Sequence, residues 1–215
     1  MSVQAIAWSS SGAVRIIDQR ALPDAEIERD LESAEAVADA IRTLQVRGAP
    51  LIGIAAAMGL VAGLRADRGA PRDAFLARLA RLVELLAASR PTAVNLRWAL
   101  DRMARAAAAA PGDGGGAALW ERLQAEATAI WEEDRAMCRR IGEAGLPLVP
   151  DGAKVLTHCN AGALATGVSA PRSRRCIWPT KPAARCTSSW TRRGRCCRAL
   201  GSPPGSSPTR AFPAP

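Results

Sequence analysis

Apolar residues recur at helical spacing through most of the first two thirds of the chain. The segment SAEAVADAIRTLQ (33–45) places Ser33 as an N-cap ahead of apolar residues that share one helix face, and PRDAFLARLARLVELLAAS (71–89) repeats this spacing. Two more helices are predicted over residues 91–110 and 118–145, which the breaker PGDGGG separates. These patterns predict amphipathic helices of one bundle. The tryptophans within them are expected in core packing: Trp98, Trp120 and Trp131.

Two stretches depart from that amphipathic pattern. APLIGIAAAMGLVAGL (49–64) is apolar on every side, yet it is shorter than the ~20 residues that cross a bilayer, and Arg47 and Arg65 bracket it. We therefore predict a buried core helix and no membrane partner. Near the N-terminus, QAIAWSSSGAVRIIDQRALP (4–23) has two short β-type runs around Ser-Ser-Ser-Gly, which predict a hairpin.

The pattern changes after the last predicted helix. GLPLVPDGAKVLTHCNAG (145–162) combines a Pro- and Gly-containing linker, a short apolar strand that ends near Thr157, and a glycine-containing turn. This order is typical of the start of a parallel α/β domain. We therefore predict an α/β protein, with a helical N-terminal domain and a small β element over residues 1–145. The beginning of an incomplete Rossmann-like domain follows over residues 146–167.

The formal net charge of +9 is distributed unevenly along the chain. Residues 168–215 contain ten Lys and Arg and no Asp or Glu, so residues 1–167 hold nineteen basic and all twenty acidic groups. The body is therefore near neutral, and the basic, Pro-rich tail is expected to be disordered. Cations interleaved with Trp178 and Trp190 would suit single-stranded nucleic acid. The chain contains no recognised nucleic-acid-binding motif, so we do not expect this partner.

Six cysteines divide between the body and the tail without a metal-binding pattern. Their spacings contain no CxxC pair, and the initial MSVQAIAWSS lacks the basic and apolar regions of a signal peptide. We therefore expect a protein of the reducing cytoplasm. The body contains Cys138 and Cys159, and the tail contains Cys176, Cys186, Cys196 and Cys197.

Two segments with Arg before Pro suggest anion sites at helix N-termini. In VRGAP, Arg47 and Gly48 precede Pro50, which suits the first position of the apolar helix. Free N–H groups at a helix start, a guanidinium and a glycine that permits close approach favour phosphate binding. SRPTAVNL repeats the arrangement with Arg90 before Pro91. The alternative for either arginine is a solvated residue that only precedes a helix.

The segment THCNAG is the third candidate for chemistry. Cys159 follows a strand and lies in a turn with Gly162, where nearby N–H groups or cations would lower the pKa of its thiol and favour nucleophilic chemistry. The alternative is an inert buried thiol. His158 is the only histidine, but neighbouring residues of a strand point to opposite faces, so we do not expect a Cys–His pair.

Taken together, VRGAPLIGIAAAMGL, SRPTAVNLRWALDRM and VLTHCNAGALAT resemble the signature blocks of the methylthioribose-1-phosphate isomerase family, in the same order and at similar separations. This family also includes ribose-1,5-bisphosphate isomerases and regulatory subunits of a eukaryotic translation initiation factor's exchange complex. The resemblance covers roughly residues 4–166, and it is specific because three independent blocks agree.

The resemblance implies a methionine-salvage isomerase that converts 5-methylthioribose 1-phosphate into 5-methylthioribulose 1-phosphate without a metal or organic cofactor. Carried over to this chain, Arg47, Gly48, Ala49 and Arg90 hold the substrate, mainly by its phosphate, and Cys159 is one of two catalytic groups. Members of the family are commonly homodimers. The alternatives are a ribose-1,5-bisphosphate isomerase, a non-catalytic regulatory subunit of the initiation-factor kind, or a nucleic-acid-binding protein that uses the basic tail.

The chain departs from the family where the second catalytic group is expected. The family pairs the cysteine with an aspartate further along a complete α/β domain, whereas no Asp or Glu follows Asp151 here. Arg-, Pro- and Cys-rich sequence without carboxylates is typical of a shifted reading frame in GC-rich DNA. Synonymous codons for residues 190–207 can also be regrouped to encode a peptide similar to a later family block. We therefore expect a truncated chain, inactive as written, with a frameshifted tail over residues 168–215.

Overall fold

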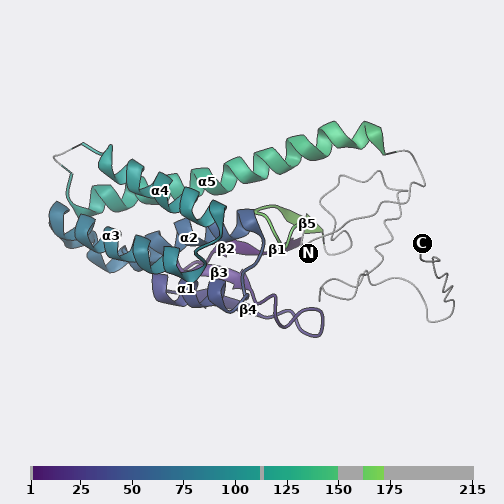
Figure 1. Ribbon diagram of the computed structural model, residues 1–215, viewed down its shortest axis with the longest axis horizontal. Helices are drawn as coiled ribbons and strands as arrows, with labels where there is room; N and C mark the ends of the chain where they lie inside the picture. Colours follow the sequence, from purple (N-terminus) through teal and green to yellow (C-terminus); the bar gives the residue numbers. More distant parts are fainter. Residues whose placement is uncertain (1, 112–113, 150–161, 172–215) are drawn as a thin grey trace, which may run out of the picture.

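The computed structural model describes residues 2–111, 114–149 and 162–171. The described part is a bundle of helices with small antiparallel sheets beside it, and the longest helix runs along the bundle and projects beyond it (Figure 1). The helices are α1 (Ala34–Arg42), α2 (Ala49–Gly63), α3 (Arg72–Ser89), α4 (Val94–Ala108) and α5 (Gly116–Gly145), with 3₁₀ turns η1 (Arg65–Gly69) and η2 (Leu146–Leu148).

Helix α2 lies at the centre of the bundle because it is apolar on every side. Every residue from Leu51 to Ala62 is buried, and the helix contacts α1, α4 and α5. Glycines let the neighbouring helices approach: a Cβ on Gly59 would lie 2.9 Å from Val37 of α1, and one on Gly53 would lie 2.8 Å from the Asn95 carbonyl oxygen of α4. The predicted core helix is confirmed.

The amphipathic helices form where apolar spacing predicted them, with corrected starts. Ser33 caps α1, since its Oγ accepts an amide hydrogen of the first turn at 3.1 Å. Pro50 occupies the second position of α2, not the first. Helix α4 begins at Val94 rather than directly after Pro91, because Arg90 ends α3 and a turn follows it. The second Arg–Pro segment is therefore a helix end followed by a turn.

The three tryptophans differ in burial. Trp131 is 9% exposed, and Trp120 is partly buried with its indole N–H bonded to a carbonyl oxygen of α2 at 2.9 Å. The expectation of core packing was wrong for Trp98, which is 47% exposed and lies 5.5 Å from the Arg102 guanidinium. Trp98 lies off the buried face of its helix. That face consists of Leu96, Ala99, Leu100, Met103, Ala106 and Ala107.

The predicted N-terminal hairpin is confirmed, and a third strand extends it. Strands β2 (Ile6–Trp8), β3 (Val14–Ile17) and β4 (Glu28–Leu31) form an antiparallel sheet in that order. Strand β4 lacks apolar alternation and was missed. An Arg15–Asp30 ion pair at 2.7 Å joins it to β3, and its last residue packs into the core.

The first strand pairs with the last described one. Strand β1 (Ser2–Gln4) is antiparallel to β5 (Ser169–Pro171), so the ordered fold extends past residue 168, where the charge pattern placed the start of a disordered tail. The predicted strand before Cys159 and the tail from residue 172 onward lie outside the described residues. The Rossmann-like domain therefore stays a prediction. None of the helices in the described ranges is long and apolar enough to cross a membrane.

Candidate functional site

The first turn of α2 carries the predicted anion-binding residues Arg47, Gly48 and Ala49. Gly48 is the N-cap and has a φ of 109°, in the region that favours glycine. Pro50 has no amide hydrogen, and the Ile52 amide bonds to the Gly48 carbonyl oxygen at 2.9 Å. The partial positive charge of a helix N-terminus adds to that of the preceding guanidinium. This turn therefore joins a helix N-terminus to an arginine that directly precedes it in the sequence.

Residues 162–168, hereafter the docked segment, pack against this turn. The Leu51 amide donates to the Ala165 carbonyl oxygen at 3.1 Å, so a residue of the protein occupies this donor. A Cβ on Gly48 would lie 2.5 Å from the Ala165 Cα, which is closer than atoms can approach. Gly48 therefore has a structural task that sequence reasoning did not foresee. The amides of Gly48 and Ala49 are the donors of the turn that can face a ligand.

Three side chains from distant parts of the sequence hold the docked segment. The Gln19 amide nitrogen donates to the Leu164 carbonyl oxygen at 2.6 Å. The Trp131 indole nitrogen donates to the Gly167 carbonyl oxygen at 2.9 Å, and the Gly167 amide donates to the Asp134 carboxylate at 2.7 Å. The helical spacing predicted Trp131 in the core, but no pattern in the sequence marks these polar contacts.

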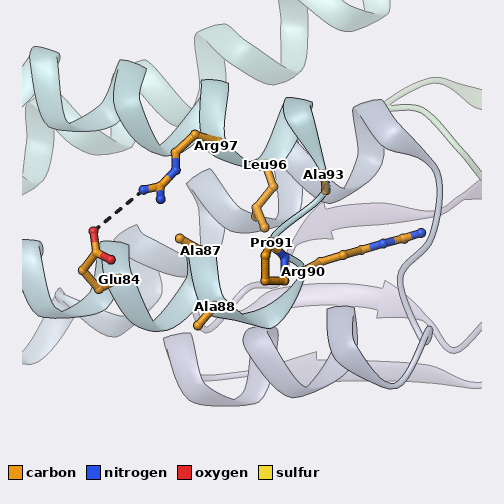
Figure 2. Close-up of a pocket in the computed structure, with 8 residues that line it drawn as sticks. All are labelled: Glu84, Ala87, Ala88, Arg90, Pro91, Ala93, Leu96 and Arg97. Atoms are coloured by element: carbon orange, nitrogen blue, oxygen red, sulfur yellow. Dashed lines mark ion pairs between the residues drawn. The ribbon is translucent and has the colours of Figure 1, made fainter.

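Arg90 lies at the same end of the bundle as the first turn of α2. The main chain of Asn95, at the start of α4, contacts Gly53 in the second turn of α2. A pocket between α3 and α4 includes Arg90, whose side chain extends away from the other lining residues (Figure 2). The remaining lining residues are Glu84, Ala87, Ala88, Pro91, Ala93, Leu96 and Arg97, and an ion pair of 3.8 Å joins Glu84 to Arg97.

A buried carboxylate precedes Gln19 at the end of β3. Asp18 is 3% exposed and accepts hydrogen bonds from the guanidinium groups of Arg20 and Arg29 at 2.9–3.0 Å. Its bond with Arg20, more than any other contact, lowers the pKa of Asp18 from 3.8 to about 2. Asp18 therefore stays ionised at neutral pH and fixes two half-exposed arginines beside Gln19.

Helix α5 brings two further titratable groups to the docked segment. Burial raises the pKa of Asp134, although its hydrogen bond from the Gly167 amide acts in the opposite direction. Burial also raises the pKa of the Cys138 thiol, and the charge of Asp134 raises it further. Cys138 is a free thiol. It therefore lacks the depressed pKa of a nucleophilic cysteine.

Cys159 and His158 lie outside the described residues, in the stretch just before the docked segment. The structure therefore leaves the predicted catalytic role of Cys159 as a prediction. It brings Arg47, Gly48 and Ala49 together in one turn. Across the described ranges, no group of three or more His, Cys, Asp or Glu side chains is placed to hold a metal ion.

Comparison with known proteins identifies the family. The sequence model of the Initiation factor 2 subunit family matches residues 45–177, which is more than half of the chain. The chain belongs to this family. The match includes the first turn of α2, Arg90 and the docked segment, so the family predicted from three sequence blocks is confirmed.

Relatives within the family include enzymes and a translation factor. A curated methylthioribose-1-phosphate isomerase of Gemmatimonas aurantiaca is 53% identical over 168 residues, which cover 77% of this chain and 47% of that protein. The crystal structure of 5-methylthioribose 1-phosphate isomerase from Pyrococcus horikoshii is 34% identical, with a TM-score of 0.72, over 78% of this chain and 46% of that one. The translation initiation factor eIF-2B subunit delta from A. fulgidus is 37% identical, with a TM-score of 0.70, over 77% and 47%. The chain spans about half the length of the curated relatives it matches.

Proposed function

We propose that the protein is a sugar-phosphate isomerase that converts 5-methylthioribose 1-phosphate into 5-methylthioribulose 1-phosphate. The 53% identity to a methylthioribose-1-phosphate isomerase over 168 residues carries this proposal. The helix N-terminus that follows Arg47, inside the region that the family model matches, supports it on physical grounds.

The substrate phosphate is held at the first turn of α2. The amides of Gly48 and Ala49 donate to phosphate oxygens, and the Arg47 guanidinium adds a charge-assisted bond. Arg90, at the same end of the bundle, supplies a second cation for the substrate.

The reaction requires ring opening before hydrogen is moved between C1 and C2. Phosphate on the anomeric carbon blocks spontaneous opening, so the substrate offers no free aldehyde. An acid and a base must therefore act together in a pocket that excludes water. Cys159 is one of this pair, and the family resemblance implies an aspartate as the other.

We further infer that residues 146–167 open a Rossmann-like domain and that residues 168–215 read partly in a shifted frame. The absence of carboxylates after Asp151 supports the second inference. The family match ends at residue 177, within that stretch. The other half of the catalytic pair, and a homodimer of the family type, belong to the complete enzyme.

Binding and turnover are tested separately on the purified full chain. Calorimetry with 5-methylthioribose 1-phosphate measures binding, and NMR follows formation of the ketose. We expect Arg47→Ala to weaken binding by about tenfold or more, because it removes a charge-assisted hydrogen bond. Arg81→Ala, which removes an exposed arginine of α3, is the matched control.

The possible outcomes distinguish substrate binding at the proposed site from catalytic turnover. Ketose formation that Cys159→Ser abolishes supports the catalytic assignment. Binding without turnover supports the sugar-phosphate site and not the catalytic assignment. Tighter binding of ribose 1,5-bisphosphate identifies the alternative substrate. A wild-type chain that binds neither sugar contradicts the proposal and favours the regulatory alternative.

A further inference from the structure

We propose that Gln19 and Asp134 are positioning residues, which hold the docked segment on the first turn of α2 and thereby decide which amides of that turn remain for a ligand. The hydrogen bonds of Gln19 and Asp134 to the docked segment, hereafter the clamp, are contacts within the protein. Only their effect on ligand binding rests on the proposed function. Neither residue lies in the sequence blocks that carry the family resemblance.

The clamp acts on main-chain groups, so it fixes the path of the segment rather than one side chain. Three carbonyl oxygens accept hydrogen bonds from three different parts of the fold: the loop after β3, α2 and α5. Gly167 is held on both sides, since Asp134 accepts its amide hydrogen at 2.7 Å and Trp131 donates to its carbonyl oxygen at 2.9 Å. The carbonyl groups belong to Leu164, Ala165 and Gly167.

Close packing leaves the docked segment little room to move. Ala163, Leu164 and Ala165 are 3%, 8% and 3% exposed. A Cβ on Gly167 would lie 2.4 Å from Cδ1 of Trp131. The hydrogen bonds therefore act on a segment that is already enclosed, and the release of one bond disturbs its neighbours.

Both positioning residues carry a feature that lowers stability. Gln19 is 5% exposed, and its Oε1 has no hydrogen-bond partner in the described part of the chain. Asp134 is partly buried where its carboxylate accepts the Gly167 amide hydrogen, and this burial raises its pKa. An unpartnered buried oxygen and a desolvated carboxylate both raise the free energy of the folded state. Each residue therefore makes its hydrogen bond to the docked segment at some cost in stability.

The consequence falls on the amides of α2. With the segment docked, the Leu51 amide is bonded to Ala165, and Pro50 has none to offer. Gly48 and Ala49 remain as donors in a geometry that is fixed before a ligand arrives. Release of the segment frees the Leu51 amide and removes the packing that holds Gly48 at its unusual φ. Preorganised donors bind more tightly because they lose less freedom on binding.

Amide hydrogen exchange on the full chain tests the clamp without any ligand. Asp134→Ala removes the acceptor of the Gly167 amide, whereas Asp134→Asn keeps a carbonyl oxygen there. We expect the Leu51 and Gly167 amides to exchange about tenfold faster in Asp134→Ala and at nearly the wild-type rate in Asp134→Asn. Glu143→Ala removes an exposed carboxylate of the same helix and is expected to change neither amide.

Gln19→Met gives an independent test, since it keeps the size of the side chain and removes the donor. We expect about tenfold faster exchange at Leu51 in this variant. Gln45→Met is the matched control, because Gln45 is also buried with an unpartnered Oε1 but has its side chain bonded to Thr43 instead. If Asp134→Ala does not fold, Gln19→Met decides the question.

Exchange at Leu60, in the middle of α2, distinguishes positioning from general destabilisation. Equal acceleration at Leu60 and Leu51 in Gln19→Met overturns the proposal, and so does unchanged exchange at Leu51. Acceleration confined to Leu51 and the docked segment supports it.

Calorimetry with 5-methylthioribose 1-phosphate tests the step that depends on the proposed function. We expect Asp134→Ala and Gln19→Met to bind about tenfold more weakly than wild type, with Asp134→Asn restoring affinity. Wild-type affinity in variants whose Leu51 amide exchanges faster overturns the positioning role. A wild-type chain that binds no sugar defeats the proposed function, and the clamp is then judged by exchange alone.

Discussion

The two ends of α2 differ in what surrounds them. At the C-terminal end, Gly63 faces apolar side chains of α1 and α3, and the Val61 carbonyl oxygen accepts the Trp120 indole hydrogen at 2.9 Å. At the N-terminal end, Gly48 has a positive φ and meets a main-chain segment whose polar groups are held by Gln19 and Asp134. Local features that lower stability cluster at sites of function. The C-terminal end of the helix is therefore closely packed against its neighbours, and the N-terminal end, where we propose the binding site, carries the positive φ and the buried polar contacts.

Gly48→Ala is expected to have the largest effect on stability. The new Cβ meets the docked segment at 2.5 Å, and the φ of 109° is unfavourable for alanine. We expect the free energy of unfolding to fall by about 3 kcal/mol in urea titrations. Gly69→Ala, at the end of the 3₁₀ turn that follows α2, has no atom within 4 Å of its Cβ position; it is the control and is expected to stay within about 0.5 kcal/mol of wild type. Equal effects of the two substitutions would contradict the role given to the contact at Gly48.

Asp18→Asn comes next and has a defined dependence on pH. The pKa of Asp18 is lowered from 3.8 in the unfolded state to about 2 in the folded state. Its ionised form therefore stabilises the fold at pH values above 3.8. The stabilisation amounts to about 2 kcal/mol at neutral pH. It is lost as pH falls through the interval from 3.8 to about 2. Urea titrations of both proteins at several pH values are expected to converge at the acid end, and a constant difference would contradict this assignment.

Asp134→Asn is expected to have a smaller effect of opposite sign. Burial raises the folded-state pKa of Asp134 above 3.8, so its ionised form destabilises the fold, and wild-type stability falls as pH rises through the folded-state pKa. The amide variant is expected to be more stable by about 1 kcal/mol at pH 7, with the gain absent in acid. Thermal unfolding across pH measures this difference. A destabilised variant at pH 7 would show that the charge itself is needed for folding.

The reactivity of Cys138 gives the smallest expected effect. Burial and the neighbouring Asp134 charge raise the pKa of its thiol, so less thiolate is present at pH 7. We expect iodoacetamide to modify Cys138 roughly threefold more slowly than glutathione, with a faster rate in Asp134→Asn. Peptide-resolved mass spectrometry follows the site. Modification faster than glutathione would place Cys138 among activated thiols.

The helices could be predicted from the sequence because their signal is local. Apolar spacing and the Ser33 cap located α1 and α3, and the uniformly apolar α2 was assigned to the core. The start of α4 was placed too early, because proline at a helix start and proline in a turn look alike in sequence. Strand β4 carries polar residues, and it is a strand only because β3 lies beside it.

The candidate site could be predicted only in part. Arg47 and Gly48 belong to the segment VRGAP, whose residue types alone predict anion binding at a helix N-terminus. The bond between Gln19 and Leu164 joins positions 145 residues apart, and no local pattern marks it. Both partners of Gly167 are side chains of α5 that bond to its main-chain groups. Every residue type except proline offers the same main-chain groups, so the sequence at position 167 does not reveal these bonds. Contacts of this kind follow from the tertiary arrangement alone.

The pairing of β1 with β5 sets an order of events during synthesis. Ser2–Gln4 is synthesised long before its partner Ser169–Pro171, because all the helices lie between them in the sequence. At roughly 5–20 residues per second, β1 waits on the order of ten seconds or more for its partner. Its unpaired edge is open to other nascent chains during that time. The helical bundle, whose contacts are more local, can form first, so we expect this small sheet to form last.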